Sequence, residues 1–235
     1  MAARKTGRPA KERLLDAAER LFAKRGYHGV SIRDITDAAK VDVALVHYHF
    51  GSKRAFLTSV FERRAEVINR ERLDRLEAVS RTDGGTLDLE AVVNAFMEPL
   101  FQRSARGGRS WKSYFALVAQ VNNSPELSVL MTRTFDPVVH KFIDVLQQAL
   151  PGADPRDIYW AYHFLTGALT LTFAETGRLD KLSGGLCRSS DLDSVHARFA
   201  PFMATGFAAL AARRVGGTEP RKARAGRKGP RPGSA

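Results

Sequence analysis

Apolar residues recur at every third or fourth position along most of the chain, which is the spacing of one buried helix face. The first such stretch runs from about Ala10 to Lys24. Pro9 before it suits a helix start, and Gly26 suits a left-handed residue after the helix end. No alternating apolar and polar runs are joined by a tight hairpin turn, since Asp83-Gly84 lies between two helical patterns. We therefore expect an all-α fold.

Two short helices and one long helix follow in the same pattern. Ser31 can cap the first short helix, and a turn at Val41–Val43 leads to the second, which ends near His49. A long charged helix then runs from Lys53 to about Val79. Later helices are predicted over Leu89–Arg103, Ser110–Val121, Pro125–Leu150, Pro155–Glu175 and Leu192–Arg213.

Three further features complete the pattern. Pro137 should bend or split the helix that contains it, because proline lacks the backbone N–H and crowds the preceding turn. Residues 179–191 are predicted as a loop. Past Val215 the chain is rich in Gly, Pro, Ala, Arg and Lys, so the segment 214–235 is expected to be a disordered basic tail.

The net charge of +12 lies almost entirely at the two ends of the 235-residue chain. Residues 1–13 carry five basic side chains and one acid, and residues 213–235 carry eight basic side chains and one acid, so the body between them is nearly neutral. Basic ends suit a polyanion, because each phosphate neutralised releases counterions. The alternative is that they only keep the protein soluble.

The remaining composition indicates a soluble cytoplasmic protein. A single cysteine, Cys187, excludes an internal disulfide framework. The N-terminus lacks the apolar stretch of a signal peptide. The most apolar run, Ile158–Phe173, is shorter than a membrane span and contains His163.

The segment Ser31–Lys53 has the features of a helix-turn-helix, in which the second short helix enters the DNA major groove. Ala38 and Ala39 provide small side chains where the helices approach, and Val41 fills the turn. The residues left facing outward are Val43, Ala44, His47, Tyr48, His49 and Lys53. A metal pair at His47 and His49 is the alternative, but residues two apart on a helix point in different directions.

Residues 8–57 resemble the DNA-binding domain of the TetR family of bacterial transcriptional regulators. The shared pattern is Leu21-Phe22-x-x-x-Gly26-Tyr27, Ser31-Ile32-Arg33-Asp34-Ile35, Ala38-Ala39-x-Val41 and His47-Tyr48-His49-Phe50-x-Ser52-Lys53. The rest of the chain resembles the family only as an all-helical ligand-binding and dimerisation domain. Lys40 and Ala44 depart from the pattern, since both positions often hold glycine, and a left-handed Lys40 would cost roughly 1 kcal/mol.

The resemblance implies a role for each matching position. Ser31 and Arg33 contact phosphate, Tyr48 and Lys53 hold the DNA backbone, Val43, Ala44 and His47 face base edges, and His49 does either. Independently of the resemblance, Thr6-Gly7-Arg8-Pro9 suits a minor-groove arm, because an arginine beside Gly and Pro can lie in a narrow groove. The alternative is that Arg8 carries incidental charge.

The second part of the chain is expected to dimerise and to bind a small molecule. Ile158–Phe173 is apolar nearly all round, so its own core can cover only part of it, and a partner subunit covers the remainder. With the last helix it would form half of a four-helix homodimer interface. Large candidates for an effector pocket are Phe96, Trp111, Tyr114, Phe115, Phe135, Trp160 and His163, with ordinary core packing as the alternative for each.

The sequence thus predicts a basic arm (1–8), a helix-turn-helix domain (9–57, its last helix reaching about 79), a ligand-binding and dimerisation domain (58–213) and a tail (214–235). The partners expected are a palindromic double-stranded DNA operator and a small-molecule effector, with no membrane. Motifs for hydrolase, phosphate-loop or metal chemistry are absent, so we expect no enzyme, no cofactor and no metal. The hypothesis is a ligand-responsive repressor, and the alternative is a nonspecific or architectural nucleic-acid binder driven by the basic ends.

Overall fold

The chain folds into helices joined by short turns. The computed structural model describes residues 8–81 and 86–212, and no strand occurs within these ranges. This confirms the all-α prediction. The helices are α1 (Ala10–Arg25), α2 (Ile32–Ala39), α3 (Val43–Phe50), α4 (Lys53–Ser80), α5 (Leu89–Arg106), α6 (Gly108–Asn122), a 3-10 turn η1 (Pro125–Leu127), α7 (Ser128–Ala149), α8 (Pro155–Phe173), α9 (Arg178–Leu182) and α10 (Leu192–Ala211).

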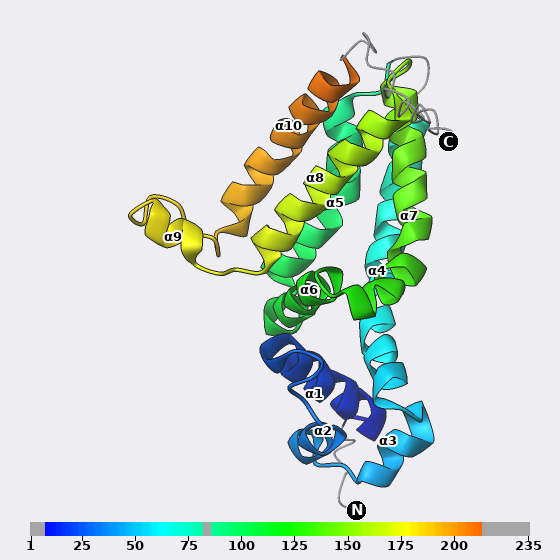
Figure 1. Cartoon of the computed structure of the whole chain (residues 1–235), viewed down its shortest axis with the longest axis vertical. Coiled ribbons are helices and arrows are strands. Elements are labelled where there is room, and N and C mark those ends of the chain that lie inside the picture. Colours follow the sequence, from blue (N-terminus) through cyan, green and yellow to red (C-terminus); the bar gives the residue numbers. More distant parts are fainter. Residues whose placement is uncertain (1–7, 82–85, 213–235) are drawn as a thin grey trace, which may run out of the picture.

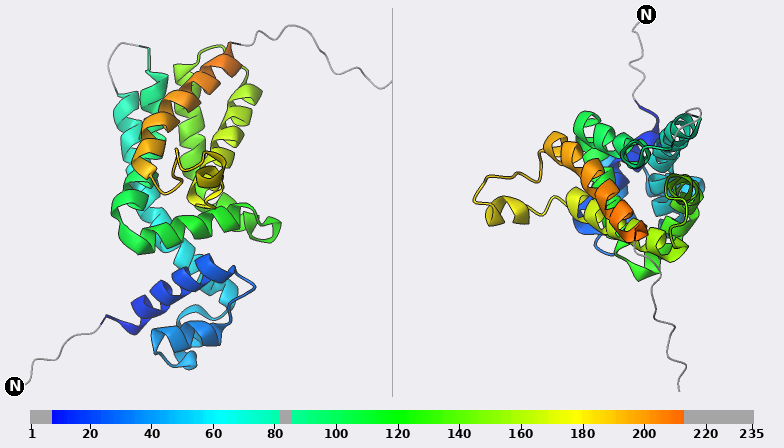
Figure 2. Two further views of the ribbon diagram at one scale, coloured as in Figure 1. Left: turned by 90° about the vertical axis from the view of Figure 1, so that its left-hand side faces the viewer. Right: turned by 90° about the horizontal axis from the view of Figure 1, so that it is seen from above.

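The helices form a small group at one end of the molecule and a larger bundle at the other (Figure 1). The small group consists of α1, α2 and α3, and α4 leads from it into the bundle of α5, α7, α8 and α10. Helix α6 crosses the lower end of the bundle and packs on α1, whereas α9 projects from the side between α8 and α10 (Figure 2). The junction between group and bundle therefore consists of α1, α4 and α6.

The longest helix is α4, whose 28 residues extend about 42 Å. Its first turns bury Phe56, Leu57 and Val60 against the small group, and its later turns bury Ile68 and Leu76 in the bundle. The buried apolar side chains of the two parts form one continuous core. Helix α4 therefore belongs to both the small group and the bundle.

Side-chain caps fix the short turns around α2 and α3. The Ser31 hydroxyl accepts from the backbone N–H of Asp34, and the Asp34 carboxylate accepts in return from the Ser31 N–H. Asp42 Oδ1 accepts from Ala44 N at 2.7 Å, and Ser52 caps α4 in the same way. Because Asp42 is the cap, Val43 is already helical, so the predicted turn at Val41–Val43 is wrong and the turn is Lys40–Asp42.

Lys40, at a position where the family often has glycine, has a left-handed conformation, with φ 53° and ψ 54°. Its side chain is exposed, so the position supports a simple test. Replacing Lys40 with glycine removes the steric cost of a side chain in this conformation, although glycine also gains freedom in the unfolded chain. We expect Lys40→Gly to raise the free energy of unfolding by about 0.5 to 1 kcal/mol in urea denaturation. The control Asp37→Gly, in the interior of the same helix, should lower it.

Three other expectations differ from the structure. Pro137 does not split its helix: α7 continues through it, with Phe135 and Val138 packed in the core, and Asn69 donates to the carbonyl of Thr134 at 2.8 Å. Residues 179–191 include most of the short helix α9 rather than being all loop. Ala38 is exposed, because the buried side of α2 consists of Ile35, Thr36 and Ala39.

Several sequence expectations concern residues outside the described ranges. They are the start of the basic arm at residues 1–7, the loop residues Asp83-Gly84, and the basic tail at 214–235. Arg8 is the one arm residue with described geometry: its Nη1 lies 2.8 Å from Asp16 Oδ2 of α1.

Candidate functional site

The outer face of α3 is a row of side chains that contact little of the rest of the protein. Val46 and Phe50 point inward, and Phe50 stacks on Phe56 of α4 with ring centroids 4.2 Å apart. The exposed side, which we call the α3 surface, carries the predicted residues Val43, Ala44, His47, Tyr48 and His49. Val43, Ala44, His47 and Tyr48 share one face of the helix, and His49 is exposed at its edge, next to Tyr48.

Tyr48 and His47 differ in how firmly they are held. The Tyr48 side chain is 83% exposed, and its ring meets the edge of the His49 ring at a centroid distance of 5.0 Å. His47 Nδ1 lies 3.3 Å from the carbonyl oxygen of Gly51, just past the end of α3. With Nδ1–H donating there, the outer ring nitrogen, Nε2, is free to accept a hydrogen bond from an external donor.

Ser31 and Arg33 begin α2, beside the α3 surface in the fold. The Ser31 hydroxyl donates to Asp34 Oδ2 at 2.5 Å while it caps the helix, so its hydrogen-bonding capacity is largely used within the protein. Hydrogen bonds from the Ser31 hydroxyl and backbone hold the pKa of Asp34 below its ordinary value. Arg33 is exposed. Of the two predicted phosphate contacts, Arg33 therefore has the free side chain.

Lys53, the last residue of the predicted set, lies over the ring of Tyr27. Its Nζ is 4.3 Å from the ring centroid, which is a cation–π distance. Tyr27 belongs to the loop between α1 and α2, and its ring also packs near Phe22 of the core. Tyr27 had no predicted role beyond its place in the family pattern, yet its ring restricts where the Lys53 charge can lie.

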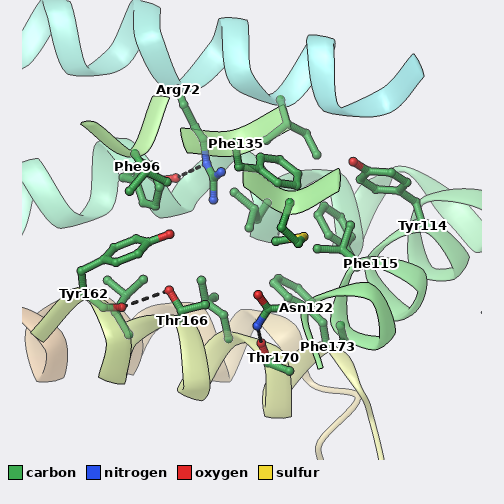
Figure 3. A pocket seen from close by; sticks show the side chains of 18 residues that line it. Arg72, Phe96, Tyr114, Phe115, Asn122, Phe135, Tyr162, Thr166, Thr170 and Phe173 are labelled. Atoms are coloured by element: carbon green, nitrogen blue, oxygen red, sulfur yellow. Dashed lines mark hydrogen bonds between the residues drawn. The ribbon is translucent and has the colours of Figure 1, made fainter. Parts of the chain in front are cut away.

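A mostly apolar pocket opens among α4, α5, α6, α7 and α8 (Figure 3). Four predicted pocket residues line it, namely Phe96, Tyr114, Phe115 and Phe135. The residues that sequence reasoning missed include Arg72, Asn122, Tyr162, Thr166 and Thr170. The spacing could have indicated Arg72, because it stands midway between the buried Ile68 and Leu76 on one face of α4.

The other three predicted pocket residues lie elsewhere. Trp111 is buried at the junction, where the guanidinium carbons of Arg64 and Arg103 lie 4.6 and 5.3 Å from its ring centroid. Trp160 is 57% exposed on the outside of α8. His163 is also exposed, and it faces a surface groove rather than the pocket. Trp160 and His163 were therefore wrongly predicted to line the pocket, because α8 turns the face containing Ile158, Ala161 and Leu165 inward.

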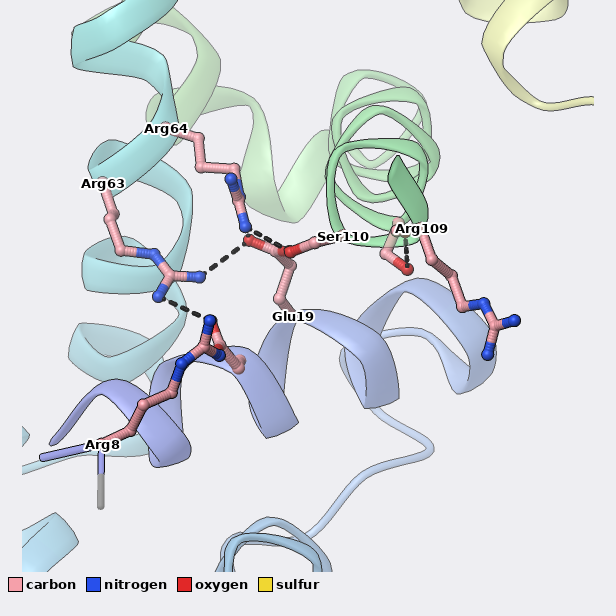
Figure 4. A network of polar contacts seen from close by, with 8 residues as sticks. Arg8, Glu19, Arg63, Arg64, Arg109 and Ser110 are labelled. Carbon is pink, nitrogen blue, oxygen red and sulfur yellow. Dashed lines mark hydrogen bonds and ion pairs between the residues drawn. The ribbon is translucent and has the colours of Figure 1, made fainter. Parts of the chain in front are cut away.

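A buried carboxylate links the three helices of the junction (Figure 4). Glu19 of α1 is fully buried, and its Oε2 lies 3.0 Å from Nη2 of Arg63 and 2.6 Å from Nε of Arg64, both on α4. The hydroxyl of Ser110, in the first turns of α6, donates to Glu19 Oε1 at 2.9 Å and contacts Arg64 as well. We call Glu19, Arg63, Arg64 and Ser110 the junction network.

Within residues 8–81 and 86–212, no group of three or more His, Cys, Asp or Glu side chains is placed to hold a metal ion. No helix of those ranges is long and apolar enough to cross a membrane.

The sequence matches two family models, one for each part of the fold. Residues 14–60 match the model described as bacterial regulatory proteins, tetR family, and residues 94–206 match the tetracyclin repressor-like C-terminal domain. The chain belongs to the TetR family. This confirms the family that the residue pattern predicted, and the second match extends TetR-family membership to the helices that line the pocket.

Individual TetR-family relatives are distant. The chain is 38% identical over 72 residues to the transcriptional repressor KstR2 of Rhodococcus jostii, covering 27% of this chain and 34% of that protein. It is 25% identical over 118 residues to the biofilm operon negative regulator IcaR of Staphylococcus aureus, covering 49% and 55%. The chain thus spans about a third to a half of the length of these curated relatives.

A solved structure shows the same fold over nearly the whole chain. It is that of a putative TetR-family regulator from Shewanella sp. PV-4, with a TM-score of 0.59 and 19% identity. The match covers 88% of this chain and 100% of that chain. At this identity the likeness establishes the fold alone.

Proposed function

We propose that the protein is a transcriptional repressor that binds a palindromic DNA operator as a homodimer and releases it when a small molecule binds. The observation that carries the proposal is the α3 surface: a short helix held by capped turns presents five side chains that its own fold leaves uncovered. Membership in a family of bacterial regulatory proteins supports it. A cytoplasmic location and the lack of a catalytic role belong to the same proposal.

The residue roles stated from the resemblance stay predictions. In the proposed complex Val43, Ala44 and His47 face base edges, while Tyr48, Arg33 and Lys53 hold phosphates, His49 does either, and Ser31 acts chiefly as a cap. Arg8 would reach the minor groove after leaving Asp16, with which it pairs. The boundaries at residues 8, 57 and 213 are likewise the division that the proposal uses, although α4 runs through the second of them.

Helices α8 and α10 supply the proposed dimer interface. Trp160 and Phe164 of α8 and Phe202 of α10 are 56 to 73% exposed, although they are large and apolar. Around them, Gly167 and Gly206 have open space where a side chain would extend, so another helix can approach closely. The same face of a second copy would cover the exposed aromatic side chains of α8 and α10. Two-fold symmetry would then place the two α3 helices of the dimer about 34 Å apart, which is one turn of DNA.

A charge in this face should prevent dimerisation. We expect Phe164→Glu to convert the dimer to a folded monomer, because like charges would face each other across the two-fold axis in a desolvated interface. Size-exclusion chromatography with light scattering measures this directly. The control Val129→Glu makes the same change at an exposed apolar residue of α7 and should leave a dimer. A dimer that persists in Phe164→Glu contradicts the assignment of the interface.

The junction network provides the physical link between pocket and DNA. Arg72 of α4 lines the pocket eight residues, or about 12 Å, beyond Arg64, which holds Glu19. Helix α6 likewise contributes Tyr114 to the pocket and Ser110 to the junction network. An effector that repositions α4 against α6 would tilt α1 and change the spacing of the two α3 helices, which shifts the population away from the DNA-bound geometry.

The proposal is tested by the DNA that the full chain selects. Sites enriched from fragmented genomic DNA at physiological salt should share a two-fold symmetric sequence with half-sites centred about one helical turn apart. The same enrichment with residues 1–8 and 216–235 deleted should return the same motif at lower affinity. Enrichment without a motif, lost altogether in the truncated chain, would instead identify a nonspecific binder driven by its basic ends.

A further inference from the structure

Arg72 is a buried cation that faces the pocket. Arg72 is only 5% exposed. Its Nε donates to the backbone carbonyl of Phe96 at 2.9 Å, and its guanidinium carbon lies 3.9 Å from the centroid of the Phe96 ring. The Phe96 ring is in turn stacked on Phe142 with centroids 4.1 Å apart. These contacts fix the guanidinium plane and leave the outer amino groups, Nη1 and Nη2, directed into the pocket (Figure 3).

The surroundings of Arg72 contain no counterion. None of the ion pairs found in the described part of the chain involves Arg72. The titratable side chains that affect the pKa of Arg72 are those of Tyr162 and Tyr114, and neither is an acid that is charged at neutral pH. Its neighbour on α4, Arg75, pairs instead with Glu98. Burial lowers the pKa of Arg72 to about 10, so it keeps its charge at neutral pH. A buried charge without an opposite charge is unfavourable, and a bound anion would relieve the cost.

The rest of the pocket wall is mostly apolar. Phenylalanine, leucine, valine, isoleucine, methionine and alanine side chains form most of it, and the polar groups near Arg72 are hydroxyls rather than acids. Burial raises the pKa of both Tyr114 and Tyr162, so each hydroxyl stays protonated and can donate a hydrogen bond. The Tyr162 hydroxyl points toward the Arg72 guanidinium, whereas the buried and unpaired Tyr114 hydroxyl lies on the other side of the pocket (Figure 3). An anionic oxygen is the group that a cation and a protonated hydroxyl together attract.

We propose that the pocket binds an organic monoanion, a carboxylate on an apolar body, whose oxygens pair with the Arg72 guanidinium while the body lies against Phe115, Phe135 and Phe173. This inference rests on the proposed function, since it names the chemical class of the effector. The planar guanidinium suits a two-oxygen group better than a single oxygen.

The test compares acids with neutral molecules of the same shape. Isothermal titration calorimetry of the full chain would use decanoate against decanol and 1-naphthoate against 1-naphthalenemethanol. We expect at least one acid to bind about tenfold more tightly than its alcohol, because a charge-assisted pair is stronger than a neutral one. In Arg72→Met that preference should disappear while the alcohol binds as before, and Arg72→Lys should retain part of it. The control Arg75→Met, one turn along α4 and outside the pocket, should bind like the unmodified chain.

The outcomes separate this inference from the proposed function. If neither acid binds more tightly than its alcohol to the unmodified chain, the inference is wrong, and this comparison needs no variant to fold. If the preference exists and survives in Arg72→Met, the anion lies elsewhere and the inference is also wrong. Specific DNA binding, measured on the same samples by gel shift, depends on neither result. Its loss would overturn the proposed function while an Arg72-dependent preference would still support the anion site.

Discussion

Tyr48→Ala should weaken operator binding about 100-fold while leaving the fold intact. The side chain is 83% exposed and contacts mainly the His49 ring, so the free energy of unfolding should change by less than about 0.5 kcal/mol. A hydrogen bond to a phosphate contributes about 1.5 kcal/mol, and each homodimer would place two copies of residue 48 on one operator. The combined loss of about 3 kcal/mol in binding free energy corresponds to a dissociation constant about 100-fold higher. Gel shift on an enriched site measures it.

Two further variants make this result specific. Tyr48→Phe keeps the ring and removes only the hydroxyl, so a phosphate contact predicts nearly the same loss as alanine. Lys24→Ala removes an exposed cation from the end of α1 that faces α6, where Gln120 donates to the neighbouring carbonyl of Ala23. That variant should bind DNA within about threefold of the unmodified chain, since it changes net charge alone. Undiminished operator binding by Tyr48→Ala would show that the α3 surface does not hold the DNA.

Glu19→Gln should lower the free energy of unfolding by about 3 kcal/mol, the largest effect on stability expected of the substitutions discussed above. The change leaves Arg63 and Arg64 beside a neutral amide at a fully buried position. Removing one member of a buried ion pair costs about 3 to 5 kcal/mol, and the lower value applies because both arginines reach solvent in part and Arg63 also pairs with Asp16. Chemical denaturation followed by circular dichroism measures the loss.

The matched control is Glu126→Gln. Glu126 forms an exposed pair with His28, so its replacement should change the free energy of unfolding by less than about 0.5 kcal/mol. Hydrogen exchange adds a local measure, because loss of the junction network should speed exchange in α1 more than in α8. A Glu19→Gln variant as stable as the control would mean that the network contributes no net stability and cannot couple α1 to α4.

The sequence was most informative where local chemistry decides the structure. Helix periodicity and the Ser31 cap each depend on a few neighbouring residues, and both are observed. The start of α3 was missed by one residue because the Asp42 cap competes with a longer turn. The exposed face of α8 was harder still, since an almost wholly apolar helix does not show which side its own core covers.

The sequence shows that two charged residues stand in apolar stripes, but it does not show what surrounds them. Glu19 and Arg72 occupy positions of the stripes of α1 and α4, between Leu15 and Phe22 and between Ile68 and Leu76. Their hydrogen-bond partners include groups of other helices: Ser110 for Glu19 and the Phe96 carbonyl for Arg72. Only the packing of α4 against α5 and α6 shows that Glu19 is held within a network of partners, whereas Arg72 is buried without a counterion among the described residues.

The central claim is that the homodimer recognises a particular DNA sequence through α3. The most direct measurement is the ratio of the dissociation constants of the full chain for a shuffled site and for its selected palindrome, at 0.15 M salt. We expect a ratio of at least about 1,000, as is typical of specific regulators. Tyr48→Ala should weaken binding to both sites, because a phosphate contact carries no sequence information. Equal affinity for the two sites, with the same steep salt dependence, would contradict the claim and identify binding through the basic ends alone.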